Sequence, residues 1–403
     1  MSERRNFPPK ADPPSADKLA YNMRFSHPRV YIGVSLVISI GVSYVLRGRI
    51  FSFFYAPTPS KLEQGVGSGA EPNARKEAEV IADNLQIPWA VAFLPDGDLL
   101  VTERPGTLQR IGKDRRAYKI EGVHHVGEGG LLGMALHPNF KENHFIYLYL
   151  TTEGGEDIKN RVERYRFEND ALLERKVILE SIPGAAYHDG GRMAFGPDGF
   201  LYITTGDSGK SDLAQNIRSL AGKILRVGDG GSIPKDNPFG NVVWSYGHRN
   251  VQGIAWDDKG RLWATEHGRS GVLSGLDELN VIEKGKNYGW PVIQGDETRA
   301  GMETPIAQSG SDETWAPAGA LYWDGSIFFG GLRGEAIYEA RIIGDKKASL
   351  TIHFHNQFGR IRDVVFGPDG AFYITTSNTD GRGTPKAGDD KIIRIESSVF
   401  RGR

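Results

Sequence analysis

The stretch AFGPDGFLYITTGD, residues 194–207, decides the fold because variants of it recur along the chain. It reads as an apolar strand, a Pro-Asp-Gly turn and a second strand with alternating side chains. An Asp-Gly pair between two such strands is a strong β-hairpin signal. Five further copies, the one at Leu321 being weaker, begin at Ala92, Ala135, Ala255, Leu321 and Val365. The sequence therefore predicts a series of six hairpins.

The hairpin series indicates a β-propeller. Hairpin repeats at intervals of ~40–50 residues are typical of propeller blades, and longer gaps leave room for loops on one face. One blade cannot bury both faces of its sheet, so the blades must stack around an axis. Pairing of EVIADNL near Glu79 with KIIRIES near Lys391 would close the ring and remove an exposed edge. We expect an all-β fold, a six-bladed β-propeller over residues 78–399.

Composition supports this fold class and excludes several kinds of site. A β-sandwich or parallel α/β fold fits less well, because only short stretches near residues 213–220 show a helical period. The 52 glycines and 10% aromatic residues suit short strands joined by tight turns. A net charge of −1 gives no reason to expect nucleic acid as a partner. The absence of cysteine excludes disulfides, thiolate metal sites and a cysteine nucleophile.

The first fifth of the chain has a different character. Residues 1–29 are rich in proline and charge, which predicts a disordered tail. An uncharged, mostly apolar run, VYIGVSLVISIGVSYVL (residues 30–46), follows them. With the apolar patch up to residue 55 it is long enough for a helix that needs ~17–20 residues to span a bilayer. We expect an uncleaved transmembrane anchor region at residues 30–55 and a linker at residues 56–77.

Two other interpretations of the apolar run stay open, a cleaved signal peptide and a buried or interfacial segment. The 29 residues that precede the run are long for the charged start of a signal peptide, and no clear small-x-small cleavage site follows it. Arginines flank the run on both sides, so its orientation in a membrane is weakly specified.

Polar phrases between the hairpins are the candidates for chemistry. YHDGGR (residues 187–192) places His188 before a repeat strand, and histidine suits proton transfer near neutral pH. YGHRNVQG (residues 246–253) gathers four hydrogen-bonding side chains before another strand. GDSG (residues 206–209) follows a strand, where a turn alone would explain it. A lone histidine is more often structural than catalytic, and an outer strand face would explain the second phrase.

A further group of phrases has the residue types of a calcium site. EHGR (residues 266–269) is followed by DELN (residues 277–280) and NYGWP (residues 287–291). Carboxylates and backbone carbonyls near a glycine-rich turn suit a hard cation such as Ca²⁺, although the spacing is not that of an EF-hand.

Three arginines indicate an anion site. Arg360 and Arg362 stand two positions apart on a predicted strand and therefore face the same side. Together with Arg333 they would bind a multiply anionic ligand in forked geometry. A solvated strand face is the alternative explanation for the pair.

These phrases occur in an order that resembles the glucose/sorbosone dehydrogenase family, the soluble aldose sugar dehydrogenases that depend on pyrroloquinoline quinone (PQQ). The resemblance covers residues 87–395 and is carried by an ordered series rather than by one motif. The matching phrases are GEGGLLGMALHP, HDGGRMAFGPDGFLY, AGKILRV, YGHRNVQGIAW, EHG, DELNVI, NYGWP and RIRDVVFGPDG. The family fold, a six-bladed propeller, agrees with the repeat count.

The resemblance implies both a cofactor and a reaction. PQQ, an ortho-quinone with three carboxylates, would lie flat over the central channel. By their matching positions, His188 is the general base that takes the proton of a sugar's anomeric hydroxyl, and Asp207 is the acid that orients it. Hydride would pass to a quinone carbonyl carbon. Arg249 matches the arginine that stabilises negative charge on the quinone oxygen.

Other matching positions imply cofactor contacts. Asn250 matches a cofactor contact, and Arg360 and Arg362 match the pair that binds the PQQ carboxylates. Arg333 stands where the glucose enzymes carry a lysine and can serve the same charge role.

The resemblance also implies two calcium sites. Gly268 and Arg269 match positions whose backbone carbonyls hold a Ca²⁺ beside PQQ. Glu278 and the carbonyl of Tyr288 resemble a second, structural calcium site.

Three positions depart from the family pattern. Glu128 stands where members often carry a glutamine against the cofactor, and a carboxylate beside a tricarboxylate is unfavourable unless it is protonated or paired with a cation. Tyr187 replaces an aspartate beside the base, and His267 replaces a glutamine.

The sequence thus predicts a membrane-anchored, PQQ- and calcium-dependent aldose dehydrogenase that oxidises the anomeric carbon of sugars to lactones. Its partners would be a small sugar, an electron acceptor of unassigned identity and a membrane, with the propeller on the extracytoplasmic side. Two alternatives are a calcium-dependent propeller hydrolase of the lactonase kind and a non-catalytic binding module.

Overall fold

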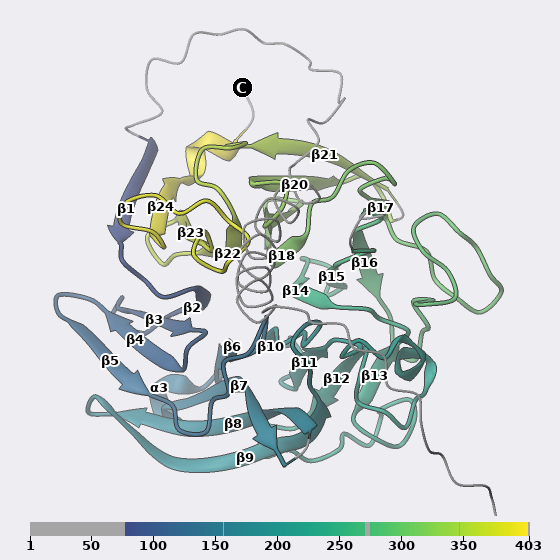
Figure 1. Cartoon of the computed structure of the whole chain (residues 1–403), viewed down its shortest axis with the longest axis horizontal. Coiled ribbons are helices and arrows are strands. Elements are labelled where there is room, and N and C mark those ends of the chain that lie inside the picture. Colours follow the sequence, from purple (N-terminus) through teal and green to yellow (C-terminus); the bar gives the residue numbers. More distant parts are fainter. Residues whose placement is uncertain (1–76, 156, 271–274, 346, 402–403) are drawn as a thin grey trace, which may run out of the picture. The chain divides into compact units, whose positions relative to one another are not determined.

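Six four-stranded antiparallel sheets make up the described part of the chain and lie around a common axis (Figure 1). The computed structural model describes residues 77–155, 157–270, 275–345 and 347–401. The predicted tail, anchor region and nearly all of the linker lie outside these residues. Within them, no helix is both long and apolar enough to cross a bilayer. The prediction of a six-bladed β-propeller is confirmed.

The first three blades follow one another along the chain. Blade 1 holds β2 (Pro88–Phe93), β3 (Leu99–Glu103), β4 (Thr107–Ile111) and β5 (Arg115–Lys119). Blade 2 holds β6 (Leu131–Leu136), β7 (Phe145–Gly154), β8 (Asp157–Glu168) and β9 (Ala171–Pro183), with the short helix α3 (Phe140–Asn143) between β6 and β7. Blade 3 holds β10 (Met193–Phe195), β11 (Leu201–Thr205), β12 (Lys223–Val227) and β13 (Val243–Tyr246).

The last three blades complete the ring. Blade 4 holds β14 (Val251–Trp256), β15 (Leu262–Glu266), β16 (Glu278–Ile282) and β17 (Ala307–Gln308). Blade 5 holds β18 (Pro317–Trp323), β19 (Ser326–Gly331), β20 (Ala336–Ile342) and β21 (Ala348–His353). Blade 6 holds β22 (Ile361–Phe366), β23 (Ala371–Thr376), β24 (Ile392–Glu396) and β1 (Ala78–Ala82). The 3₁₀ helices are η1 (Ser211–Gln215), in the stretch whose period was helical, and η3 (Ser397–Phe400).

The ring closes by pairing the two ends of the propeller. β1 pairs antiparallel with β24, with Ala78 opposite Ile395 and Val80 opposite Ile393. The N-terminal strand is thus the outermost strand of the blade that the C-terminal residues build (Figure 1). This is the closure predicted from the two segments near Glu79 and Lys391, and it leaves neither of them as an unpaired inner edge.

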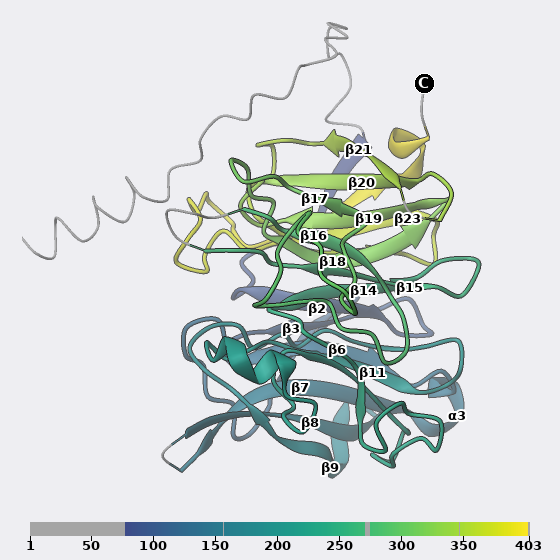
Figure 2. The same cartoon turned by 90° about the vertical axis from the view of Figure 1, so that its right-hand side faces the viewer.

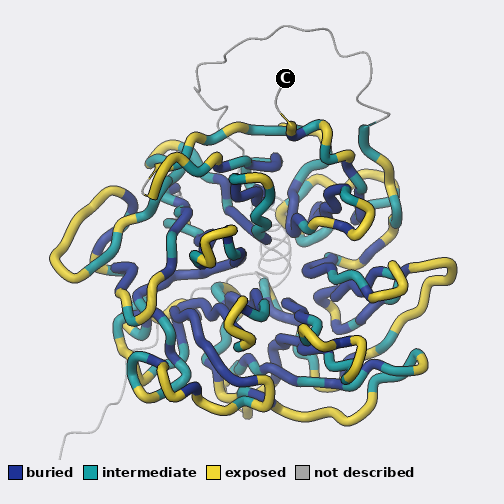
Figure 3. Tube along the Cα trace, turned by 180° about the vertical axis from the view of Figure 1, so that it is seen from behind, coloured by how far each residue is buried: buried dark blue, intermediate teal, exposed yellow. Residues whose placement is uncertain are grey.

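The second strand of a blade is buried on both faces. Every residue of β3, β11, β15, β19 and β23 is buried, which explains why the ITT and VTE phrases show little polar alternation. Apolar residues of neighbouring blades form shared core clusters. Figure 3 colours the buried residues dark blue. Exposed residues gather in the turns and the outer strands (Figure 3).

The recurring threonine of the second strand links neighbouring blades. The hydroxyl of Thr102 donates to the carbonyl of Leu132 in the next blade at 2.6 Å, and that of Thr265 donates to Ala318 at 2.7 Å. Thr204 makes the equivalent bond to Val251 at 2.9 Å. A buried hydroxyl needs a hydrogen-bond partner, and the repeated Thr finds one in a backbone carbonyl on the innermost strand of the following blade.

Hairpin geometry decides which face of the propeller carries the site. The strands run between two faces that both carry loops (Figure 2). The Pro-Asp-Gly turns join the first strand of a blade to the second, so the residues before the first strand and after the second meet at the opposite face. An isolated bridge between Gly206 and Asn250 shows this meeting directly, because Gly206 follows β11 and Asn250 precedes β14.

Candidate active site

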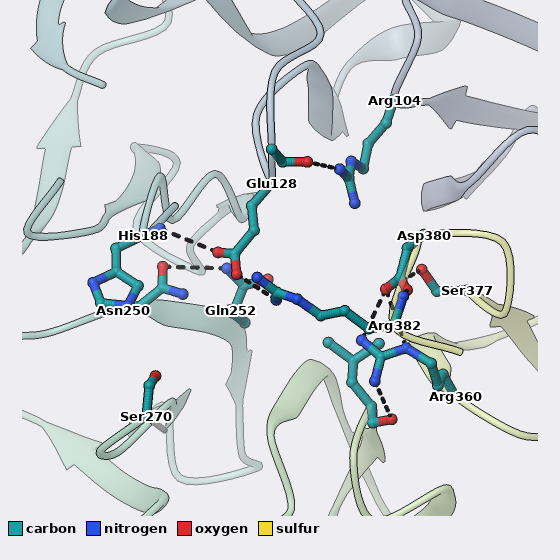
Figure 4. A network of polar contacts seen from close by, with 12 residues as sticks. Arg104, Glu128, His188, Asn250, Gln252, Ser270, Arg360, Ser377, Asp380 and Arg382 are labelled. Carbon is teal, nitrogen blue, oxygen red and sulfur yellow. Dashed lines mark hydrogen bonds and ion pairs between the residues drawn. The ribbon is translucent and has the colours of Figure 1, made fainter. Parts of the chain in front are cut away.

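The candidate site lies at the face opposite the Pro-Asp-Gly turns. The residues that precede a first strand include Glu128, His188, Arg249, Asn250 and Arg360. The residues that follow a second strand include Arg104, Asp207, His267 and Arg382. Segments from five blades therefore meet here, and several of their side chains contact one another (Figure 4).

His188 is paired with a buried carboxylate. Its Nδ1 lies 2.7 Å from Oδ1 of Asp207, and the two side chains are 13% and 2% exposed. The other oxygen of Asp207 accepts the indole N–H of Trp290 at 2.9 Å, and Oδ1 also accepts the N–H of Gly209 at 2.8 Å. Burial alone would raise the pKa of Asp207, but these hydrogen bonds and the charge of a protonated His188 lower it. An ionised Asp207 holds the imidazole with Nδ1 as the donor and leaves Nε2 to accept a proton.

The backbone of His188 is held as firmly as its ring. His188 has a φ of 60°, in the left-handed region that non-glycine residues rarely adopt. Its N–H donates to Oε2 of Glu128 at 3.1 Å, and its carbonyl accepts the N–H of Ser208 at 3.2 Å. The surrounding hydrogen bonds thus fix a strained residue, an arrangement that is frequent at functional sites.

Arg249 lies beside this pair. Its Nη2 donates to the hydroxyl of Ser270 at 2.7 Å, and its guanidinium lies 5.3 Å from the ring centre of Trp290. The backbone N–H of Arg249 donates to the carboxylate of Glu266. Burial lowers the pKa of Arg249, with Asp207 as the first of the carboxylates that oppose the shift. The same indole therefore contacts the partner of His188 and supports Arg249.

Asn250 is fully buried between two blades. Its Oδ1 accepts the N–H of Gly190 at 3.0 Å and that of Gln252 Nε2 at 3.3 Å, and Figure 4 shows Asn250 beside His188 and Gln252. Among the described residues, its Nδ2 has no hydrogen-bond partner. A buried amide with an unused donor is unusual and marks a position where a ligand can supply the acceptor.

The predicted arginine pair is brought together on one side of the site. Arg360 donates through Nη2 to Asp380 at 2.8 Å and through Nη1 to the carbonyl of Leu332. Arg362 donates to Oε1 of Gln252 at 2.8 Å, and burial lowers its pKa to about 9. Both arginines are 7% exposed, so the alternative of a solvated strand face is wrong.

Arg333 follows β19, the second strand of blade 5, and so stands at the same face as Asp207 and His267. Its neighbour Leu332 accepts a hydrogen bond from Arg360 and lines the recess described below. The N–H of Arg333 donates to the carbonyl of Trp315 at 3.2 Å, and the residue is partly buried. The convergence of Arg333 with Arg360 and Arg362 stays a prediction.

Sequence reasoning missed two arginines. Arg104 donates to the carbonyl of Gly127, next to Glu128. Arg382 reaches across from the loop after β23 to Oε1 of Glu128 at 2.5 Å (Figure 4). Both follow the second strand of a blade, the place that Asp207 and His267 also occupy, and this shared position is the signal that could have found them.

Glu128 is therefore paired with a cation. Burial opposes its ionisation, but Arg382, His267 and the N–H of His188 lower its pKa to about 2. A carboxylate beside an anionic cofactor must be either protonated or paired with a cation, and Glu128 is paired with a cation.

A recess of about 310 Å³ opens between these residues. It is lined by Trp89, Glu128, Leu132, Asp189, Gly190, Gln252, His267, Leu332, Arg362 and Arg382. Among the described residues, buried nitrogens without a hydrogen-bond partner occur around it, on Arg104, Asn250, His267 and Arg362. Two arginines, Arg362 and Arg382, line the recess against two carboxyl side chains, Glu128 and Asp189, and Glu128 is paired with Arg382. The arginines and the unused donors fit a ligand that carries negative charges.

A second, smaller recess of about 260 Å³ shares His267 with the first. Gly268, Glu278 and Tyr288 line it together with Arg249, Glu266 and Trp290. Glu278 lies directly opposite Glu266 across the β15–β16 pair, and burial followed by the charge of Glu266 raises its pKa to about 8. A cation beside the buried Glu266 and the partly buried Glu278 would stabilise both carboxylates.

The predicted calcium ligands are distributed unevenly around this second recess. The N–H of Gly268 donates to Asp277 at 2.8 Å, and Arg269 exchanges backbone hydrogen bonds with Gly275. The carbonyl of Arg269 is thus already used at 3.3 Å. Among the described residues, no three His, Cys, Asp or Glu side chains converge as a metal centre, so a cation here would depend on backbone carbonyls.

Comparison with known proteins shows which family has a similar sequence. Residues 85–393 match the family model for glucose/sorbosone dehydrogenase. The aldose sugar dehydrogenase YliI of Escherichia coli is 33% identical over 345 residues, 76% of this chain and 92% of that protein. Quinoprotein glucose dehydrogenase B of Acinetobacter calcoaceticus is 35% identical over 257 residues, 54% of this chain and 53% of that protein.

A solved structure agrees over the same region. The PQQ-bound aldose sugar dehydrogenase of Streptomyces coelicolor matches with a TM-score of 0.73 and 41% identity, covering 79% of this chain and 97% of that one. The family match spans more than half of the chain, and the structural match covers nearly the whole of a family member. This chain belongs to the glucose/sorbosone dehydrogenase family.

Proposed function

We propose that this chain is a PQQ-dependent aldose sugar dehydrogenase that oxidises the anomeric carbon of an aldose to a lactone. The observation that carries the proposal is the pairing of His188 with ionised Asp207 near a recess that Arg362 and Arg382 line. A proton acceptor and a polyanion site next to each other are what oxidation with a carboxylated quinone requires. PQQ-binding and sugar oxidation are named for two of the relatives above, and the site residues fit both.

The proton is handled by His188. The anomeric hydroxyl transfers its proton to Nε2, because Nδ1 is committed to Asp207 at 2.7 Å. The imidazolium that results is stabilised by the Asp207 carboxylate, which Trp290 and Gly209 hold in place. Bound PQQ would supply the acceptor for the hydride that leaves the anomeric carbon, so that a sugar loses two electrons and two protons overall.

Charge around the cofactor is handled by the arginines. Arg333, Arg360 and Arg362 would bind its carboxylates, and Asn250 would offer its unused Nδ2 as a donor. Arg249 would stabilise negative charge on the quinone oxygen as electrons arrive. Its guanidinium is held by Ser270 and Trp290 before any ligand binds, and this preorganisation is what electrostatic stabilisation needs.

Calcium belongs to the proposal at two places. The carbonyls of Gly268 and Arg269 would hold one ion beside the cofactor, and Glu278 with the carbonyl of Tyr288 would hold a second. The support for the second ion is that Glu278 lies opposite Glu266 on the neighbouring strand.

The direct test combines a binding and a turnover measurement. Purified chain is titrated with PQQ in the presence of Ca²⁺, and the absorbance of the quinone gives the dissociation constant. The loaded protein is then assayed for dye reduction with a panel of aldoses, and the product is analysed for lactone. Absence of both PQQ binding and dye reduction would contradict the proposal. His188→Ala should abolish turnover and leave PQQ affinity within about threefold, because the ring is not a charge partner of the cofactor.

Two other functions rank below this one. A calcium-dependent hydrolase of the lactonase kind needs several carboxylate or Asn side chains around an axial metal, whereas the recess described above has two carboxyl side chains, and one of them, Glu128, is paired with Arg382. A non-catalytic binding module would have no need for the His188–Asp207 pair. Lactone hydrolysis without PQQ would favour the first, and PQQ-independent binding without turnover the second.

We further propose that residues 30–55 anchor the chain in a membrane with the propeller on the extracytoplasmic side. The support is the uncharged apolar run that the sequence places before the propeller. Fractionation tests the anchor, since the full chain should stay with membranes after an alkaline carbonate wash. Protease added to intact cells tests the side, because only an extracytoplasmic propeller would be cleaved.

A further inference from the structure

We infer that Arg382 is the counter-ion that allows Glu128 to stand beside an anionic cofactor, and that the two act together as positioning residues for His188. The inference rests on the proposed function, since it concerns the binding of PQQ. Neither the arginine nor its pairing with Glu128 is implied by the motifs of the chain.

The pair joins distant parts of the ring. Glu128 precedes β6 in blade 2, and Arg382 follows β23 in blade 6, 254 residues later. Their side chains meet at 2.5 Å, and Figure 4 shows Arg382 extended across the site toward Glu128. The Arg382 side chain is 54% exposed and that of Glu128 is 23% exposed, so the pair lies at the rim of the recess that both residues line.

Glu128 carries the contact onward to the base. Its second oxygen, Oε2, accepts the N–H of His188 at 3.1 Å. Its own N–H donates to the carbonyl of Ala186 at 2.9 Å, so the two segments are tied twice. His188 has a φ of 60° and needs external support to keep that conformation. Arg382, Glu128 and His188 therefore form one continuous chain of contacts from the rim to Asp207.

Charge gives the pair its second role. A carboxylate that lines a recess for a tricarboxylate repels the ligand unless a cation neutralises it. The guanidinium of Arg382 neutralises the charge of Glu128 at the rim of the recess. Without Arg382, a partly buried and unpaired anion would face the cofactor, and such a charge is costly in a site of low polarity. The importance of Arg382 for binding should therefore depend on Glu128.

A double-mutant cycle on PQQ affinity tests this dependence in the full chain. Arg382→Ala should weaken PQQ binding about tenfold or more when Glu128 is present, and less than about threefold in the E128Q background. Glu128→Gln alone should bind PQQ at least as tightly as the wild type, because the amide still accepts the N–H of His188 and carries no charge. Arg382→Lys, which keeps the charge, should stay within about threefold of the wild type.

Controls separate this role from general damage to blade 6. Arg394 forms a comparable ion pair with Asp369 at 2.6 Å in the same blade but away from the recess, and Arg394→Ala should leave PQQ affinity unchanged. If the wild type binds PQQ but R382A lowers the affinity equally in the wild-type and E128Q backgrounds, this inference is wrong while the proposed function stands. A wild-type chain that binds no PQQ would overturn the proposed function and this inference with it. A loss of affinity in R394A equal to that in R382A would also overturn it.

Discussion

Asp207 Oδ1 and His188 Nδ1 lie 2.7 Å apart although the loops that carry them flank different strands of blade 3. His188 precedes β10 and Asp207 follows β11, so the antiparallel hairpin between them brings both residues to one face. The carboxylate is 2% exposed and ionised, which sets the tautomer of the ring. The hairpin that builds the blade therefore also builds the His188–Asp207 pair.

Replacing Asp207 with Asn tests the role of that charge. The amide keeps the shape of the side chain but can donate to Nδ1, which would put the proton of the ring on Nε2 and prevent it from accepting another. We expect kcat with aldoses to fall about 10³–10⁴-fold, as for a wrong tautomer in other histidine-dependent sites, and PQQ affinity to change little. Steady-state dye reduction and PQQ titration measure the two quantities. A turnover number within tenfold of wild type would reject this role for Asp207.

Trp290 should matter through its N–H rather than through its size. Its indole donates to Asp207 at 2.9 Å and lies under the guanidinium of Arg249 at 5.3 Å. Trp290→Phe keeps an aromatic ring but removes a hydrogen bond to a charged group, which typically contributes ~1.5–3 kcal/mol. We expect kcat to fall about tenfold or more, with a melting temperature near that of the wild type. If kcat is unchanged while Asp207→Asn is inactive, Asp207 does not depend on the indole.

The ion pair of Glu128 predicts a particular acid dependence of stability. The pKa of Glu128 is lowered from its ordinary 4.5 to about 2, so the stabilisation is complete above about pH 4.5 and is lost as the pH falls toward about 2. Wild type should exceed Glu128→Gln by about 1–2 kcal/mol at pH 7, a value reduced for the half-exposed Arg382. Urea unfolding of both chains between pH 7 and pH 3 measures the difference, which should narrow only below about pH 4.5. A constant difference across that range would contradict the assigned pairing.

The sequence alone predicts the inner strands of each blade but not the pairing of the outer strands. The Pro-Asp-Gly turn and the buried second strand, as in β10 and β11, have strong local signals. The long outer strands β8 and β9 carry polar side chains and no Pro-Asp-Gly turn between them. Their pairing depends on the neighbouring strands, which a local pattern does not report.

The same limit applies to the site. His188, Asp207 and Arg249 stand in phrases whose order resembles a known family, so they could be named in advance. The pairing of Arg382 with Glu128 could not be predicted, because the two side chains meet only after blade 6 closes the ring next to blade 1.

Tyr187 should influence the choice of sugar. Its side chain is the exposed neighbour of the base, 48% exposed, with its ring centre 4.8 Å from that of His188 at 82°. An exposed aromatic face packs well against the C–H groups of a sugar ring. Tyr187→Ala should raise KM for aldoses about three- to tenfold without changing PQQ affinity, and Tyr187→Phe should behave like the wild type. Steady-state kinetics on several aldoses would show whether the loss varies among them, and an unchanged KM for every sugar would exclude this contact.

Removal of calcium should destabilise the chain through Glu278. The buried Glu266 and the partly buried Glu278 lie opposite each other on β15 and β16, and a bound cation would stabilise both carboxylates. A site occupied at about a hundred times its dissociation constant adds ~2.7 kcal/mol, so EDTA should lower the melting temperature of the wild type by roughly 5 °C. Glu278→Gln removes one proposed ligand, and its melting temperature should respond less to EDTA and to added Ca²⁺ than that of the wild type. Calorimetry on both chains decides the matter, because an equal response to EDTA in the two would mean that the ion binds elsewhere.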